Sequence, residues 1–202
     1  MLMLRAAAAL RAAPVQMRTF TAPPSLPYPR AAVAVTVLRH EVCEATSERQ
    51  YLLAQRARSP GKGTWSLPGG KVNLGEGCLE AAARELLEET ALGPKELRYS
   101  PWPIAATDVI VPESDENATS VAFHYVLTQF FAFAEADVEP HSGDDASSVR
   151  WATLAEVESG SFPLGGDVAS VLRRAEQLLG NGALTHDEAI AVEVESVNPP
   201  GV

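Results

Sequence analysis

The stretch "GGKVNLGEGCLEAAARELLEETAL", residues 69–92, decides the fold of this chain. It opens with a glycine-rich loop and continues as a predicted helix that carries several glutamates within a few turns. Like charges three or four residues apart on a helix repel each other by about 0.2–0.5 kcal/mol per pair. The crowding of carboxylates therefore predicts a positively charged ligand beside this helix.

A helix with about 100° between successive residues divides this sequence into two faces. The side chains expected to pack on a sheet are Leu79, Ala82, Ala83, Leu86 and Leu87. The opposite arc carries Arg84, Glu85, Glu88 and Glu89. We expect the three carboxylates to converge on one patch, and carboxylate oxygens are preferred ligands of Mg²⁺. A solvated acidic face is the alternative, and the helix alone does not decide between the two.

The loop in front of the helix favours the metal site. "LPGGKVNLGEG" (67–77) is a glycine-rich connection of the kind that brings backbone close to a ligand. The spacing is Gly70, five residues, Glu76, seven residues, Arg84-Glu85-Leu86, one residue, then Glu88-Glu89. This pattern resembles the signature box of the Nudix hydrolases. The resemblance implies an α/β fold, a Nudix-type α/β/α sandwich with a mixed central sheet.

The resemblance also implies roles for individual residues. Nudix enzymes hydrolyse nucleoside diphosphates linked to another group with Mg²⁺ or Mn²⁺, and the implied metal ligands are Glu85, Glu88 and Glu89. Arg84, Glu85 and Glu88 form the implied catalytic set. Arg84 would orient the glutamates, with Glu76 as its partner, and we expect the arginine to lower the pKa values of the crowded carboxylates. The residues expected to support the site structurally are Gly70 and Glu76.

The general base is left open between a box residue and a distal acid. Within the family the base is sometimes the box glutamate, here Glu85, and sometimes an acid on a later loop. The loop candidates are Asp144, Asp145, Glu113, Asp115 and Glu116. Ordinary solvated charge is the alternative reading of each loop acid.

One position departs from the family box. The box has a glycine near its end, where this chain has Ala91. A left-handed turn after a helix costs alanine about 1 kcal/mol or more. We expect Gly93 to take over that turn two residues later.

The substrate is predicted from further resemblance. "WSLPGGKV", "FHYVLTQFFA" and "GDDASSVRW" together resemble the ADP-ribose pyrophosphatase-like branch, over roughly residues 30–180. Arg56 is a candidate to hold a substrate phosphate, and Trp65 or Phe131 a candidate to contact a base. Core packing is the alternative for both aromatic side chains. His124, within a long apolar strand, is expected to be a core histidine.

The remaining elements agree with a layered α/β domain. Strands are expected at 31–40, 50–56, 64–67, 97–112 (interrupted by prolines) and 120–134, and at 149–153 before a short helix. A second amphipathic helix is expected at 166–180, and acidic loops at 113–119 and 139–148. Strand pairs that alternate with two main helices favour a mixed sheet between helical layers.

Composition limits the partners. The formal net charge of −10 argues against nucleic acid as the main partner, whereas a small nucleotide bound through metal ions stays open. No apolar run approaches the ~20 residues that span a bilayer, so no membrane partner is expected. Cys43 and Cys78 are expected to be reduced, and a homodimer is left open.

The amino-terminal segment differs from the rest. "MLMLRAAAALRAAPVQMRTF" (1–20) carries arginines and alanines but no acid, which is typical of a transit peptide. A mitochondrial location is expected, with cytoplasm or plastid as alternatives. The expected organisation is a transit peptide and proline-rich linker at 1–29, the Nudix domain at 30–181 and a loose acidic tail at 182–202.

The sequence therefore predicts a Nudix pyrophosphohydrolase. It would cleave the diphosphate of ADP-ribose, or of a related nucleoside diphosphate derivative, by metal-assisted attack of water. The alternatives are a hydrolase of oxidised nucleoside triphosphates and a non-catalytic Nudix-like binding module.

Overall fold

The structure is a computed structural model. It describes residues 28–39, 48–59, 61–114, 117–135, 137–143 and 146–194. The predicted transit peptide and Cys43 lie outside the described residues. Within the described part, no helix combines the length and the apolar character needed to cross a membrane.

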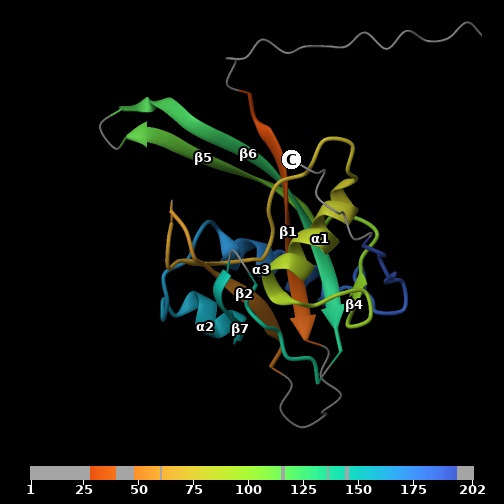
Figure 1. Cartoon of the computed structure of the whole chain (residues 1–202). Coiled ribbons are helices and arrows are strands. Elements are labelled where there is room, and N and C mark those ends of the chain that lie inside the picture. Colours follow the sequence, from red (N-terminus) through yellow and green to blue (C-terminus); the bar gives the residue numbers. More distant parts are fainter. Residues whose placement is uncertain are drawn as a thin grey trace, which may run out of the picture.

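The described residues form one mixed sheet with helices on both sides (Figure 1). The strands are β1 (Arg30–Arg39), β2 (Gln50–Arg56), β3 (Trp65–Ser66), β4 (Leu97–Tyr99), β5 (Ala105–Ser114), β6 (Asn117–Ala134) and β7 (Ala146–Thr153). The helices are α1 (Cys78–Thr90), α2 (Leu154–Glu158) and α3 (Val168–Gly180). The sheet runs in the order β3-β2-β1-β6-β4, with β5 beside β6 and β7 beside β2. The predicted α/β/α sandwich with a mixed sheet is confirmed.

The central strand β1 supplies both layers of the core. It pairs in parallel with β6 over its whole length, and successive side chains point to opposite faces of the sheet. Val33, Val35 and Val37 pack on the α1 side, whereas Ala34 and Leu38 pack on the α3 side. Burial on both faces explains why β1 is a continuous apolar run rather than an alternating one.

The β5–β6 hairpin differs from its prediction. An acidic loop was expected at 113–119, but β5 runs to Ser114 and β6 starts at Asn117, opposite each other in the ladder. Backbone pairing therefore continues where residue polarity predicted a loop. The register shifts around Pro112, which lacks the N–H that a regular ladder requires. The hairpin extends beyond the rest of the sheet (Figure 1).

The carboxyl-terminal segment also differs from its prediction. The loose tail expected from residue 182 is wrong for the described residues up to 194. Ile190 and Tyr99 exchange two backbone hydrogen bonds of 2.8 Å each, and Leu184 and Val192 are buried. The acids between these apolar residues gave the segment a polar composition that concealed its packing.

Candidate active site

The glycine-rich loop is fixed against the central strand. Val33 N–H donates to the Gly70 carbonyl and Val35 N–H to the Pro68 carbonyl, each at 2.9 Å. A Cβ atom at Gly69 would lie 2.2 Å from the Val33 carbonyl oxygen, which is an impossible contact. Only glycine lets the loop approach β1 this closely, and the approach places the start of α1 over the sheet.

Helix α1 follows this loop and buries its alanine-rich face. The buried residues are Ala81, Ala82, Ala83, Leu86 and Thr90. One expectation needs correction. Leu87, expected in the core, is 37% exposed, because it lies at the edge of the apolar arc. Thr90 is buried and satisfies its hydroxyl by donating to the Leu86 carbonyl at 2.6 Å.

Helix α1 ends in a left-handed residue, but not at the expected one. Ala91 itself adopts φ 58° and ψ 12°, and its N–H donates to the Leu87 carbonyl. Gly93 is not among the described residues with positive φ. The expectation that Gly93 takes over the turn is therefore wrong, and Ala91 bears the strain of the left-handed region.

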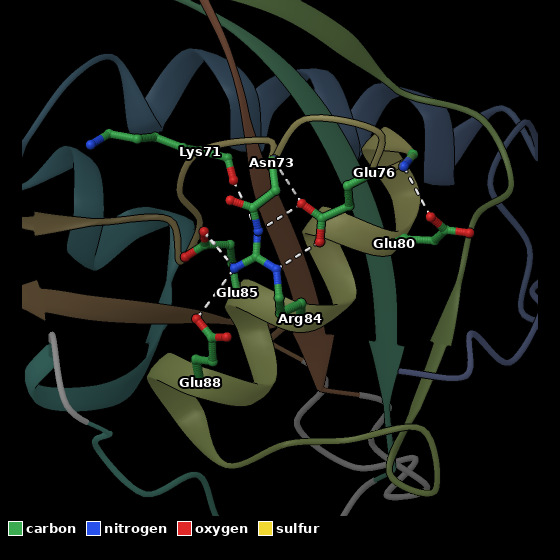
Figure 2. A network of polar contacts seen from close by, with 8 residues as sticks. Lys71, Asn73, Glu76, Glu80, Arg84, Glu85 and Glu88 are labelled. Atoms are coloured by element: carbon green, nitrogen blue, oxygen red, sulfur yellow. Dashed lines mark hydrogen bonds and ion pairs between the residues drawn. The ribbon is translucent and has the colours of Figure 1, made fainter. Parts of the chain in front are cut away.

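Arg84 is the centre of the polar network on α1 (Figure 2). Its Nε and Nη2 donate to the two carboxylate oxygens of Glu76 at 2.6 and 2.9 Å. Its Nη1 donates to Glu85 at 2.9 Å and to Glu88 at 3.3 Å, and Nη2 also reaches the Lys71 carbonyl at 2.9 Å. The predicted contact between Arg84 and Glu76 is confirmed as a two-pronged ion pair.

The surroundings shift the pKa values of Glu76 and Glu85 in opposite directions. Hydrogen bonds from Arg84 hold the pKa of Glu76 below its usual value. Burial raises the pKa of Glu85, and this effect outweighs the favourable contact with Arg84. The arginine thus lowers the pKa of both carboxyl groups, as expected, but at Glu85, whose side chain is only 16% exposed, burial raises the pKa by more.

Gly70 forms a cradle for the Glu85 carboxylate. A Cβ atom at Gly70 would lie 2.3–2.5 Å from the carboxylate atoms of Glu85. Any side chain at this position would displace Glu85 or the loop. The structure therefore gives a steric reason for the glycine that the sequence pattern places there.

The three glutamates do not meet at one point. Glu85 and Glu88 both contact Arg84, whereas Glu89 accepts a hydrogen bond of 3.0 Å from the Gly69 N–H. Across the described ranges, no group of three or more His, Cys, Asp or Glu side chains is placed to hold a metal ion. The expected convergence is not seen, because Arg84 draws Glu85 and Glu88 to one side while the Gly69 N–H holds Glu89 on another.

Two adjoining cavities lie at this end of the sheet. The first, which we call the polar cavity, has a volume of about 440 Å³ and is lined by Glu85, Glu89, Arg56, Arg58, Lys71 and Asn73, among others. The second, which we call the apolar cavity, measures about 410 Å³, and its lining includes Val109, Val111, Phe123, Tyr125 and Leu127. Arg56, Gly70 and Lys71 line both cavities. Carboxylates and cations therefore face a single cleft that continues into an apolar space.

A model of the NUDIX domain matches residues 28–174 of the chain. The chain belongs to the NUDIX domain family. A short stretch is 48% identical over 48 residues to an ADP-ribose pyrophosphatase of Methanocaldococcus jannaschii. That stretch covers 24% of this chain and 28% of the archaeal enzyme, so the match spans well under two thirds of the relative.

Solved structures agree on the fold. The NUDIX domain of Shewanella oneidensis NrtR complexed with ADP ribose has a TM-score of 0.57 at 22% identity, covering 78% of this chain and 93% of that one. A C. elegans Ap4A hydrolase in a binary complex also has a TM-score of 0.57, at 18% identity. The match covers 75% of this chain and 98% of that one. At these identities the likeness concerns the fold alone.

The donor chemistry of this NUDIX domain fits the implied divalent ion. Glu85 and Glu89 present carboxylate oxygens to the polar cavity, and Glu88, next to them on α1, is 58% exposed. Oxygen-only ligands are those that Mg²⁺ and Mn²⁺ prefer. The residues present are therefore suited to such an ion.

Two predicted substrate residues have different positions. Arg56, at the end of β2, lines both cavities. Trp65 instead packs on Phe162, with 6.1 Å between ring centroids, and lies 5.8 Å from the Arg150 guanidinium. Trp65 lines neither cavity, so packing, its alternative reading, is correct. Phe131 is fully buried in the core, again as its alternative reading stated.

The predictions for His124 and for the distal acids have different outcomes. His124 is not a core histidine: it is partly exposed on the β5–β6 hairpin and lies 2.7 Å from Asp108. Asp144 and Asp145 lie outside the described residues, as do Asp115, Glu116 and the side chain of Glu113.

Sequence reasoning missed several contributors to the cleft, among them Arg58, Lys71 and Tyr125. Lys71 directly follows Gly70 in the box, a position that could have been noted. Tyr125 lies two residues from both Phe123 and Leu127 on β6, and this period of two was a usable signal for one face of a strand.

Proposed function

We propose that this chain is a pyrophosphohydrolase that cleaves the diphosphate of ADP-ribose or of a related nucleoside diphosphate derivative, with Mg²⁺ or Mn²⁺. Membership of the NUDIX domain family supports hydrolysis of a pyrophosphate bond as the reaction class. The observation that carries the proposal is the polar cavity, where Glu85 and Glu89 face Arg56, Arg58 and Lys71. Such a cavity offers cations for phosphate oxygens and carboxylates for a metal ion.

The cationic side chains would bind the diphosphate. Arg56 and Arg58 come from the end of β2 and the loop after it, and Lys71 from the glycine-rich loop. Guanidinium groups bind phosphate oxygens through paired, charge-assisted hydrogen bonds. In a chain with net charge −10, these three cations at one cavity would also counter the general repulsion of an anionic substrate.

The glutamates would hold the metal, and Arg84 would hold the glutamates. Glu85, Glu88 and Glu89 are the proposed ligands, and the Glu76–Arg84 ion pair fixes the guanidinium that contacts Glu85 and Glu88. A bound divalent ion would neutralise phosphate charge and favour water as a nucleophile. Gly70 leaves the space that Glu85 occupies.

Hydrolysis needs a base that accepts a proton from the attacking water. The water oxygen bonds to phosphorus as the bond from phosphorus to the leaving oxygen breaks. Glu85 is one proposed base, because it lines the polar cavity in which the diphosphate and the attacking water would lie. Asp144 and Asp145, outside the described residues, remain the distal alternatives.

Three observations support a nucleoside diphosphate derivative as the substrate. The short archaeal match is to an ADP-ribose pyrophosphatase, and one NUDIX domain of similar fold was solved with ADP ribose. The apolar cavity next to the cations presents Tyr125 and Phe123, and aromatic side chains suit contact with a flat base. The diphosphate and the base would thus occupy adjoining parts of one cleft.

A substrate panel tests this proposal. The protein is incubated with ADP-ribose, NADH and an oxidised guanine triphosphate, with and without Mg²⁺, beside Glu88→Gln. Glu193→Gln is the matched control, because it makes the same charge change at an exposed position of the carboxyl-terminal segment, away from α1. We expect AMP from ADP-ribose only when both Mg²⁺ and Glu88 are present. Preference for the triphosphate would contradict the substrate, and hydrolysis of none would contradict the enzymatic function.

A further inference from the structure

The loop at residues 137–143, between β6 and β7, is tied to the end of α1. His141 N–H donates to the Thr90 carbonyl and Gly143 N–H to the Glu89 carbonyl, each at 2.9 Å. The last four carbonyls of a helix have no partner within the helix. A segment distant in sequence therefore supplies two of the donors that the end of α1 requires.

Gly143 makes this docking sterically possible. A Cβ atom at Gly143 would lie 1.8 Å from the Glu88 carbonyl oxygen and 2.9 Å from the carbonyl carbon. Both atoms belong to helical backbone, which cannot turn aside as a flexible side chain would. Any substituent at Gly143 must move the loop away from α1 or move the last turn of α1.

The docked turn is the one that carries two proposed metal ligands. The loop contacts the backbone of Glu88 and Glu89, and the Glu89 side chain lines the polar cavity. Ala146, the first residue of β7, lines the same cavity. The end of α1 and the start of β7 therefore form one wall of the cleft, and the contact at Gly143 joins them.

The end of α1 depends on this outside support. Its own terminating residue is Ala91 in a left-handed conformation, which costs a side-chain-bearing residue about 1–2 kcal/mol. The Glu89 side chain is meanwhile directed to the Gly69 N–H. The position of Glu89 is thus set from two sides, by Gly69 at its carboxylate and by Gly143 at its carbonyl.

We propose that Gly143 is a positioning residue: by docking residues 141–143 on the last turn of α1, it sets Glu88 and Glu89 for metal binding. The proposal rests on the proposed function, which assigns those glutamates to the metal. Residues that orient metal ligands from outside the ligand set typically change metal affinity or activity by about 10–100-fold when they are altered.

The first test compares two glycine substitutions in the full chain. Gly143→Ala introduces the clash, whereas Gly180→Ala, at the end of α3, has nothing within 4 Å of the added atom. We expect Gly143→Ala to weaken Mn²⁺ binding, measured by calorimetry without substrate, by about tenfold or more. Its kcat for ADP-ribose should fall by more than its KM rises, and Gly180→Ala should match the wild type.

A folded Gly143→Ala with wild-type Mn²⁺ affinity and kcat would overturn the proposal. So would a variant that only melts at a lower temperature, because that outcome describes a purely structural glycine. A wild type that binds no Mn²⁺ and hydrolyses nothing would instead contradict the proposed function itself, so the two failures are distinguishable.

A second measurement uses the unaltered protein and does not depend on whether the variant folds. If docking at Gly143 favours metal binding, metal binding must favour docking by the same factor. We expect Mn²⁺ to slow hydrogen exchange of the Gly143 and His141 amides, with the Gly182 amide after α3 as a reference. Unchanged exchange at Gly143 when Mn²⁺ is bound would overturn the proposal.

Discussion

At the scale of single residues, the site depends on one guanidinium shared by three carboxylates. Arg84 contacts Glu76 through two hydrogen bonds, and Glu85 and Glu88 through one each. The resemblance of the box spacing to that of the Nudix hydrolases implied the Arg84–Glu76 contact, and the structure contains it. The spacing could not predict the raised pKa of Glu85, because it says which groups are neighbours and not how much water reaches each of them.

Glu76→Gln should lower the free energy of unfolding by about 1–3 kcal/mol at neutral pH, since it weakens charged hydrogen bonds. The folded pKa of Glu76 is below its unfolded value, so its contribution is complete above about pH 4.3 and is lost as the pH falls through the folded pKa. Urea unfolding at pH 7 and near pH 3 measures the free energy of unfolding of the wild type and of Glu76→Gln. A difference between wild type and Glu76→Gln that is as large near pH 3 as at pH 7 would contradict this account.

At the scale of elements, the end of α1 was predicted less well than its middle. The helical period predicted most of the buried face, but Leu87 is 37% exposed, and the burial of Thr90 was not predicted. Which residue adopts the left-handed conformation depends on the tertiary contacts that the chain makes directly after the helix. Here these are the packing of Leu92 and the docked loop, which no local pattern reveals.

Ala91→Gly should raise the free energy of unfolding by about 1 kcal/mol, because glycine adopts φ near 58° without a Cβ penalty. Ala169→Gly, within α3, is the matched control and should lower it by about 1 kcal/mol. Denaturant midpoints for the two variants compare them directly. Destabilisation by Ala91→Gly would mean that the left-handed turn is not a source of strain.

The two faces of β6 offer another test at this scale. Tyr125 lines the apolar cavity, whereas Val126, the next residue, is 41% exposed, as the alternation of a strand requires. We expect Tyr125→Ala to raise KM for ADP-ribose about tenfold, from a lost aromatic contact of about 1–1.5 kcal/mol. Val126→Ala should leave KM unchanged. If the two substitutions changed KM equally, the adenine base of the substrate would not contact Tyr125.

At the scale of the whole molecule, the order of predicted strands and helices was enough for the layered fold. The parallel pairing of β1 with β6 brings residues about 95 positions apart into register, and the sequence pattern contains no sign of this pairing. The cleft depends on it, because residues 32–34 of β1 line the same apolar cavity as Tyr125 and Leu127 of β6. The sequence therefore predicted the box residues well and the residues that complete the cleft poorly.

The amino-terminal segment gives a prediction for the chain as a whole. A fluorescent protein fused after residue 29 should enter mitochondria, because residues 1–20 carry arginines without acids. Arg5, Arg11 and Arg18 changed to Gln should abolish import. Diffuse fluorescence from the unaltered fusion would contradict the mitochondrial location.

The central claim is that carboxylates of α1 and a divalent ion together cleave a diphosphate. Its most direct test is the rate of AMP release from ADP-ribose at saturating Mg²⁺, for the wild type and for Glu85→Gln. We expect a loss of about 100-fold or more in kcat, because Glu85 is both a proposed ligand and a proposed base. A Glu85→Gln variant that releases AMP at the wild-type rate would contradict it.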